Sequence, residues 1–272
     1  MSRQITKDTR LCISLAGRPS NIGTRFHNFL YEELGLDFVY KAFTTTDLAA
    51  AIAGIRGLGI RGCGVSMPYK EACIPYLDEL DGSARALQSV NTIVNDDGHL
   101  RGYNTDYIAV IRLLEQYRVS PELSFALRGS GGMAKAVTGA LHDAGFRSGI
   151  ILARNETTGR PLAGTYGYEW RTEIGDAQPD LLINVTPIGM AGGPEAETLA
   201  FNPAVIDGAQ VVFDVVAVPP KTPLIRYAKV GGKVVITGGE VIALQAVEQF
   251  VLYTGVRPTE AQIRRASKYA RA

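Results

Sequence analysis

Phe125-Ala-Leu-Arg-Gly-Ser-Gly-Gly-Met-Ala-Lys-Ala-Val137 is the stretch from which the fold of this chain can be worked out. Its first residues predict a strand, its glycines a sharp turn, and the apolar residues that recur from Met133 onward a helix. The pattern Gly129-x-Gly131-x-x-Ala134 fits the dinucleotide-binding fingerprint, with alanine in the third place. Free N–H groups at the start of such a helix favour an anion such as a pyrophosphate. Similar turns also occur without a ligand, but the strand before this one and the helix after it favour nucleotide binding.

The strand predicted next, at residues 149–153, ends at Arg154. An acid at this strand end is usual where NAD is preferred, because it binds the ribose hydroxyl, whereas an arginine suits the 2′-phosphate of NADP. The alternative is a solvated surface arginine, which is a common feature. The position at the strand end favours NADP as the cofactor.

Composition limits the class of protein. The 272 residues suffice for one large domain or two modest ones, and 46% hydrophobic with 20% charged residues indicates a globular chain. A net charge of +1 gives no reason to expect nucleic acid or a membrane surface as a partner. No apolar run approaches the roughly 20 residues of a membrane-spanning helix, and the N-terminus lacks the apolar core of a signal peptide. The three cysteines and three histidines have no metal-ligand spacing, so we expect a cytoplasmic protein without a metal.

Strands and helices alternate along the chain, which predicts mostly parallel sheets with helices on their faces. Among the last helices, Gln245 is a polar residue inside an apolar stripe. Strands are predicted at residues 11–15, 37–43, 62–67, 125–127, 149–153, 180–185, 210–215 and 233–237; helices are predicted after a loop at residues 17–24, ending at Gly35, and at residues 46–58, 241–253 and 259–271.

Lys70 follows the third predicted strand. Pro68 begins a new helical stretch there, which places Lys70 on its first turn, at the edge of the sheet where ligands collect in open α/β folds. A lysine at a helix start faces the positive end of the helix dipole, and a residue placed against a local rule is a candidate functional residue. The alternative is a solvated lysine.

Asp106 follows a predicted hairpin over residues 89–103, whose turn is Asp97-Gly98. It is predicted to cap the helix that runs on to Leu114, and capping alone would explain it. If Lys70 lies across a cleft, the carboxylate holds the ammonium group charged and oriented. Such a pair can move a proton to or from a substrate oxygen.

Several stretches resemble one family, the shikimate and quinate dehydrogenases, and most of all its divergent shikimate-dehydrogenase-like branch. They follow one another in family order over nearly the whole chain, and together they are far more specific than any single motif. The matching stretches are Val65-Ser-Met-Pro-Tyr-Lys70, Ser89-Val-Asn-Thr92, Gly102-Tyr-Asn-Thr-Asp106, Gly129-Ser-Gly-Gly-Met-Ala134, Asn184-Val-Thr-Pro-Ile-Gly-Met190, Asp214, Thr222-Pro-Leu224 and Gln245.

The resemblance implies two α/β domains with a cleft between them. Residues 1–106 and 240–272 would form the substrate-binding and catalytic domain, and residues 107–239 a Rossmann-type NADP-binding domain. The implied reaction is the NADP-dependent, reversible oxidation of shikimate to 3-dehydroshikimate, a step of the shikimate pathway of aromatic amino acid biosynthesis. The implied partner is a small molecule, and the chain would be a monomer or a homodimer.

The resemblance also implies the site residues. Lys70 and Asp106 fall on the family's catalytic pair, and Ser66 keeps the hydroxyl of the family's usual threonine. The substrate-binding residues would be Ser20, Asn21, Ser66, Asn91, Asp106 and Gln245. The cofactor-binding residues would be Gly129, Ser130, Gly131, Gly132, Met133, Ala134, Arg154, Asn155, Thr186, Val216 and Gly238.

The chain departs from the family pattern at residues that would bind the substrate, above all its carboxylate. The family's first loop usually carries two serines and a proline before His-Asn, where this chain has Asn21, Gly23 and Thr24. Gly64 replaces a family asparagine, and Ala217 stands where a family tyrosine reaches the substrate. Losing one charge-assisted donor costs on the order of 1.5–3 kcal/mol, which is about a ten- to hundredfold loss of affinity.

Three alternatives therefore stay open. The first is an enzyme with weak shikimate turnover. The second is the same chemistry on quinate, an aminated analogue or another cyclic polyol acid. The third belongs to a different class, a dinucleotide-binding regulator without turnover, in which Lys70 and Asp106 merely hold the cleft.

Overall fold

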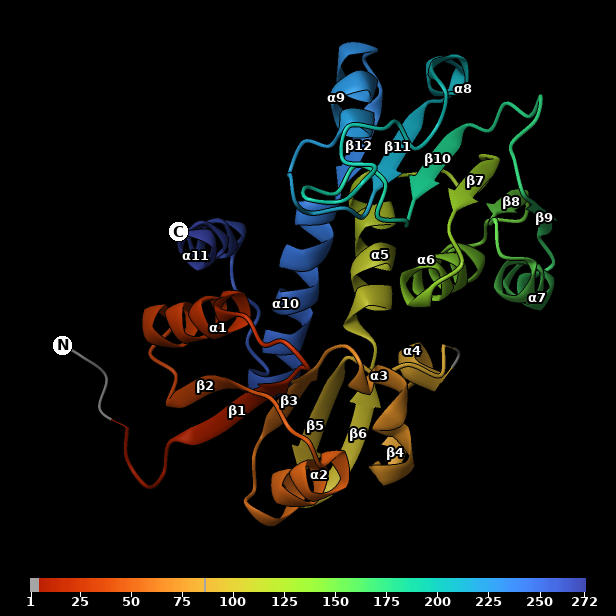
Figure 1. Cartoon of the computed structure of the whole chain (residues 1–272). Coiled ribbons are helices and arrows are strands. Elements are labelled where there is room, and N and C mark those ends of the chain that lie inside the picture. The colour runs from red at the N-terminus through yellow and green to blue at the C-terminus, as the bar shows by residue number, and fades with distance from the viewer. Residues whose placement is uncertain (1–4, 86) are drawn as a thin grey trace. The chain divides into compact units, whose positions relative to one another are not determined.

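The computed structural model describes residues 5–85 and 87–272. They form two compact units. The first comprises the chain up to Thr105 together with Ala243–Ala272, and the second comprises Asp106–Ile242. Each unit contains a six-stranded sheet with helices packed against it (Figure 1). The α/β class predicted from the sequence is confirmed.

The sheet of the first unit has the strand order β2-β1-β3-β5-β6-β4. Its first three strands are parallel, and β5 runs antiparallel to both β3 and β6. The turn of the β5–β6 hairpin is Asp97-Gly98, with φ of 52° and 93°, as the sequence predicts. The elements are β1 (Arg10–Leu15), α1 (Asn21–Glu33), β2 (Phe38–Phe43), α2 (Leu48–Gly57), β3 (Gly62–Val65), α3 (Tyr69–Ala72), the 3₁₀ helix η1 (Ile74–Tyr76), β4 (Glu79–Leu80), α4 (Gly82–Arg85), β5 (Thr92–Asp96), β6 (His99–Tyr103), most of α10 (Gly238–Thr254) and α11 (Glu260–Arg271).

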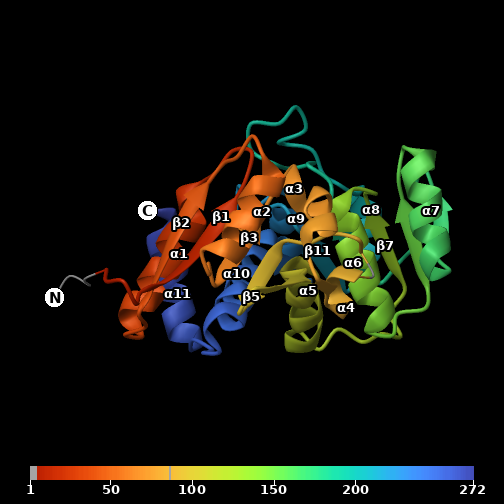
Figure 2. The same cartoon turned by 90° about the horizontal axis from the view of Figure 1, so that it is seen from below.

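Both faces of this sheet are buried, because successive side chains of a strand point to opposite faces. On one face Cys12 of β1 and Tyr40 of β2 pack with Phe250 and other residues of α1, α10 and α11. On the other face Ile13 of β1 and Cys63 of β3 pack with α2. Helix α11 lies against α1, which brings the end of the chain back to its first helix (Figure 2).

The sheet of the second unit is parallel throughout, with the order β12-β11-β10-β7-β8-β9. Figure 1 shows its six strands side by side in that order. From β7 the chain moves outward to β8 and β9, and then returns to the other side of β7 to build β10, β11 and β12. The elements are α5 (Thr105–Gln116), β7 (Phe125–Arg128), α6 (Gly132–Asp143), β8 (Gly149–Leu152), α7 (Glu156–Tyr166), β9 (Glu169–Arg171), β10 (Leu181–Asn184), α8 (Pro203–Gly208), β11 (Val211–Asp214), α9 (Pro223–Val230) and β12 (Val234–Thr237).

This order is that of the Rossmann dinucleotide-binding fold, whose ligands bind at the carboxyl ends of the strands where the chain reverses direction across the sheet. In this unit the reversal lies between β7 and β10. The glycine turn at Gly129 directly follows β7 and therefore stands at the place where that fold binds its cofactor.

Two local predictions are wrong. Asp106 does not cap α5 but lies inside its first turn, because the helix already begins at Thr105. The predicted loop over residues 17–24 ends earlier than expected, because α1 begins at Asn21 and Ser20 takes the N-cap position. The shared cause is that helix starts are set by backbone contacts, whereas the sequence pattern marks only where the apolar face begins.

Membrane spans and metal clusters are both absent from the described part of the chain. None of its helices is long and apolar enough to cross a membrane. Within the same residues no cluster of His, Cys, Asp or Glu could hold a metal ion. The three cysteines are buried, and burial raises the pKa of the Cys12 and Cys73 thiols to about 12, so both stay protonated and pack as small apolar groups.

Candidate functional site

A pocket of about 220 Å³ opens at the carboxyl ends of β7, β8 and β10 in the second unit. The predicted cofactor-binding residues Gly129, Ser130, Arg154, Asn155 and Thr186 all line it. Its remaining lining residues are Arg128, Leu152, Ala153, Pro187 and Ile188. The pocket thus collects loop residues that follow three different strands.

Gly129 of the glycine turn lines this pocket at a position that requires glycine. Gly129 has a φ of 128°, and an added Cβ would lie 2.7 Å from Val185. By contrast, a Cβ on Gly131 or Gly132 would meet no described atom within 4 Å. These two positions are exposed at the start of α6, so a ligand can approach their backbone closely.

Two further predicted residues begin the helix after the turn. Met133 is half-buried, and Ala134 is fully buried on the side of α6 that packs against the sheet. A small residue in the third place of the fingerprint lets the helix lie close to β7. Ala134 therefore acts through packing rather than through ligand contact.

Polar side chains shape the rim of the pocket. Asn155 caps α7, since its Oδ1 accepts a hydrogen bond from the Thr157 amide at 3.0 Å. The Ser130 hydroxyl lies 2.7 Å from that of Thr158. Arg154 is exposed, and none of the described residues pairs with its guanidinium. The segments that follow β7 and β8 are therefore tied together, while the guanidinium of Arg154 stays available to a ligand.

A buried network holds the loops that follow β10 and β11. Asp214 is fully buried, and its carboxylate accepts hydrogen bonds from the side chains of Asn184 at 3.0 Å and Thr222 at 2.6 Å. Burial raises the pKa of the Asp214 carboxyl, and these hydrogen bonds oppose that rise. Asn184 in turn accepts from the amide and the hydroxyl of Thr186, which fixes Thr186 beside the pocket.

Two predicted cofactor residues lie outside the lining of this pocket. Val216 is buried and donates its amide to Asp214 at 3.1 Å. Gly238 begins α10, where a Cβ would come within 2.2 Å of the Val215 carbonyl oxygen. Both have structural roles beside β11, and their contact with a cofactor stays a prediction.

In the first unit, Asn91 connects the two segments that carry the predicted catalytic residues. Its Oδ1 accepts hydrogen bonds from the amide and the hydroxyl of Thr105, at 2.8 and 3.1 Å, directly before Asp106. The neighbouring Val90 amide donates to the Lys70 carbonyl at 2.8 Å. The Asn91 side chain is fully buried, yet its Nδ2 has no acceptor among the described residues. A buried donor without an acceptor is costly, which makes Asn91 a candidate binding residue.

Lys70, Asp106 and Ser66, the residues predicted for catalysis and substrate binding, lie at the ends of helices and strands. Lys70 is half-buried in α3, and Asp106 is 9% exposed. Ser66 is exposed directly after β3, where its amide donates to the Leu15 carbonyl at 2.9 Å. Their direct contact with a substrate stays a prediction.

Helix α10 adds a second glutamine that sequence reasoning misses. The predicted residue Gln245 is half-buried, and Gln249 lies one turn further along the same face. Gln249 donates to the Asn91 carbonyl at 3.1 Å and to the Thr92 hydroxyl at 3.0 Å. Its spacing of one helical turn from Gln245 was the only feature of the sequence that could have pointed to Gln249. In the structure its hydrogen bonds hold the backbone of Asn91 in place.

The predicted carboxylate-binding residues lie at the start of α1. Ser20 and Asn21 are both exposed, and the Ser20 hydroxyl makes no capping hydrogen bond to the helix. Nearby, the departure at Gly64 has a steric cause. A Cβ there would lie 2.9 Å from the Tyr40 hydroxyl, so the phenol fills space that a side chain at position 64 would need.

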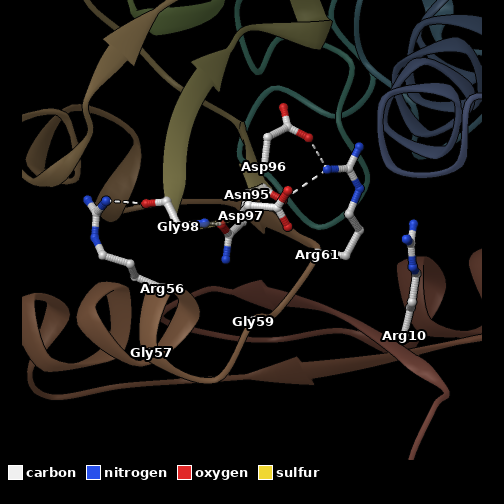
Figure 3. A pocket seen from close by; sticks show the side chains of 9 residues that line it. All are labelled: Arg10, Arg56, Gly57, Gly59, Arg61, Asn95, Asp96, Asp97 and Gly98. Carbon is white, nitrogen blue, oxygen red and sulfur yellow. Dashed lines mark hydrogen bonds and ion pairs between the residues drawn. The ribbon is translucent and has the colours of Figure 1, made fainter.

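A larger pocket of about 580 Å³ lies elsewhere in the first unit, and none of the predicted site residues line it. Figure 3 shows Arg56 directed at the Gly98 carbonyl and Arg61 directed at Asp96. Arg56 also pairs with Asp78 at 2.7 Å. Because carboxylates balance these arginines, the pocket offers little excess charge to an anion.

Comparisons with known proteins agree on one family. Residues 21–93 match the family model described as the shikimate dehydrogenase substrate binding domain. A shikimate dehydrogenase-like protein of Haemophilus influenzae is 57% identical over 98% of both chains. The NADP(+) shikimate dehydrogenase of Moorella thermoacetica is 36% identical, covering 93% of this chain and 90% of its own.

Solved structures give the same result. A shikimate 5-dehydrogenase-like protein superimposes with a TM-score of 0.98 at 57% identity, covering 99% of this chain and all of its own. The Thermus thermophilus shikimate 5-dehydrogenase, solved with NADP(H) and shikimate, reaches a TM-score of 0.85 at 26% identity over 96% of this chain and 99% of its own.

Proposed function

This chain belongs to the shikimate dehydrogenase family, and we propose that it interconverts shikimate and 3-dehydroshikimate with NADP(H). The observation that carries the proposal is the buried Nδ2 of Asn91, which lacks an acceptor among the described residues beside the segments of Lys70 and Asp106. A ring hydroxyl of a polyol acid would supply that acceptor. As part of this proposal, the enzyme acts in the cytoplasm as a monomer or a homodimer.

The mechanism needs one proton and one hydride. Bound NADPH supplies the hydride at its nicotinamide ring. Lys70 donates its proton to the ketone oxygen in the reducing direction, and its neutral amine takes the proton back in the oxidising direction. Asp106 orients the Lys70 side chain, while Asn91 holds a neighbouring hydroxyl.

The pocket residues suit the adenosine half of NADP. The exposed backbone of Gly131 and Gly132 offers N–H groups to the pyrophosphate. Arg154, which has no partner in the described chain, suits the 2′-phosphate. Val216 and Gly238 are assigned to cofactor binding from the family resemblance.

Kinetics of a lysine variant test the proposal. NADPH formation is followed by absorbance with shikimate and NADP, in the parent and in Lys70→Met. Loss of the proton-transfer group is expected to lower kcat by about 10²- to 10⁴-fold. Lys229→Ala, which removes an exposed lysine of α9, is the matched control and keeps the parent rate. Equal rates in the parent and Lys70→Met would remove Lys70 from the mechanism.

The altered start of α1 favours a second candidate within the same chemistry. Asn21, Gly23 and Thr24 stand where the family has its serine clamp, so quinate, an aminated analogue or another cyclic polyol acid becomes the preferred substrate. A substrate panel ranked by kcat/KM separates these candidates from shikimate. If calorimetry shows that NADP binds but no polyol acid is turned over, the chain is a dinucleotide-binding regulator instead.

A further inference from the structure

Arg128 is a charged residue at the end of a buried central strand. The three residues before it in β7 are fully buried, and it pairs in register with Leu152 of β8 and Asn184 of β10. Its side chain is 18% exposed. Burial lowers the pKa of its guanidinium, as expected for a cation that has left water. A buried cation is retained only where other groups compensate its charge.

The protein alone compensates Arg128 poorly. Glu173, its nearest acid, is 3.9 Å away and 74% exposed, and such pairs contribute little. The Phe201 ring lies 5.3 Å from its guanidinium carbon and covers one side of the group. Its Nε is buried and has no acceptor among the described residues. An anion that reaches the exposed part of this side chain would therefore improve the balance of its charge.

Arg128 and Arg154 line the same pocket of about 220 Å³. Glu195 is the other acid that attracts the charge of Arg128, whereas the charge of Arg154 repels that of Arg128. Two guanidinium groups at one small cavity raise its potential, and a dianion placed between them removes their mutual repulsion. The planar fork of arginine matches phosphate oxygens in pairs, which gives such a site geometric selectivity.

We propose that Arg128 is a second phosphate-binding residue of this pocket, which holds the 2′-phosphate of NADP together with Arg154. The proposal rests on the assignment of NADP as the cofactor and adds a specificity-determining residue to it. Because NAD has a hydroxyl where NADP has this phosphate, Arg128 contributes to the choice between them. The phosphate on the ribose meets the part of the Arg128 side chain that stays exposed at the pocket.

Calorimetric titration of the full chain tests the proposal with four ligands. NADP and adenosine 2′,5′-bisphosphate carry the 2′-phosphate, whereas NAD and 5′-AMP lack it. Arg128→Met keeps an unbranched stem against Phe201 but removes the charge and the donors. We expect it to weaken binding of the first two ligands by about 10- to 100-fold and of the other two by less than about twofold. Arg154→Met is expected to show the same pattern.

Two further variants separate a ligand role from a structural one. Arg128→Lys keeps the charge without the fork, and is expected to recover part of the lost NADP affinity even if Arg128→Met folds poorly. Glu173→Gln removes the acid that pairs with Arg128 and is expected to retain NADP binding. Equal losses for NAD and NADP, or unchanged NADP affinity in both Arg128 variants, would overturn the inference while leaving the proposed function intact. A parent protein that binds neither 2′-phosphorylated ligand would overturn both.

Discussion

At the scale of single residues, burial decides which protonation states are available. His27 of α1 is 1% exposed and stacks on Tyr40, with ring centroids 4.4 Å apart. A charged imidazole cannot be hydrated there, so burial lowers the His27 pKa from 6.5 to about 3, against a smaller opposing effect of its hydrogen bond to Gln249. The His27 ring is therefore neutral in the folded protein at neutral pH.

This neutral histidine makes stability depend on pH. Above pH 6.5 His27 is neutral in both the folded and the unfolded chain, and its contribution to the free energy of unfolding is fully present. As the pH falls from 6.5 towards 3, only the unfolded chain takes up the proton, so the folded state loses about 2 kcal/mol by pH 5. In His27→Phe, which keeps an aromatic ring in the cluster, this loss is expected to disappear. Urea unfolding at pH 7 and pH 5 measures this loss in the free energy of unfolding. An equal loss in the parent and in His27→Phe would contradict the lowered pKa of His27.

Single residues could be predicted from the sequence where they stand alone against a local rule. Arg154 at a strand end is such a case, since the structure places it at the pocket, whereas the catalytic role inferred for Lys70 at a helix start stays a prediction. Arg128 and Gln249 could not be predicted. Arg128 ends a strand whose apolar residues dominate the pattern, and Gln249 resembles any other polar residue on a helix. Only tertiary packing shows that Gln249 contacts Asn91.

At the scale of elements, the β7–α6 turn separates two uses of glycine. Gly129→Ala forces a side chain into a φ of 128° and against Val185, which is expected to cost about 1–3 kcal/mol and lower the unfolding temperature by several degrees. Gly131→Ala has an ordinary φ of −82° and open space around the new methyl group, so stability is expected to change by less than about 1 kcal/mol. The methyl group instead blocks the approach of a pyrophosphate.

Two measurements test this separation. Thermal unfolding without ligand is expected to resolve Gly129→Ala from the parent but not Gly131→Ala. Titration with NADP is expected to show at least about a tenfold loss of affinity in Gly131→Ala, because its backbone can no longer lie against the phosphates. Parent-like NADP affinity in that variant would show that the pyrophosphate does not bind at this turn.

Elements with strong local signals could be predicted, and several others, among them the helix α7, could not. The hairpin β5–β6 and the helices α6, α10 and α11 lie where the pattern places them, since turn residues and apolar stripes are local signals. The three-residue strand β9 and the short helix α8 were not predicted, because their formation depends on the sheet edge and loops they pack against.

At the scale of the whole molecule, the chain forms two units, and each buries apolar clusters of its own. The polypeptide crosses between them at Thr105–Asp106 and again at Ile242–Ala243. A ligand held within one unit stabilises that unit directly, because it binds the folded and not the unfolded form. The pocket at β7, β8 and β10 belongs entirely to the second unit, so its occupant acts there first.

Hydrogen exchange read by mass spectrometry measures this separation. NADP at one hundred times its Kd stabilises the unit that binds it by about 2.7 kcal/mol, which slows exchange through unfolding of that unit by about 100-fold. We expect this slowing in the core strands β7, β10 and β11, and less than about a threefold change in β1 and β3 of the first unit. In Arg154→Met at the same NADP concentration the slowing is expected to shrink, because less of the protein is occupied. Equal slowing in both sheets would show that the chain unfolds as one cooperative body, since binding energy from one pocket would then protect every core amide alike.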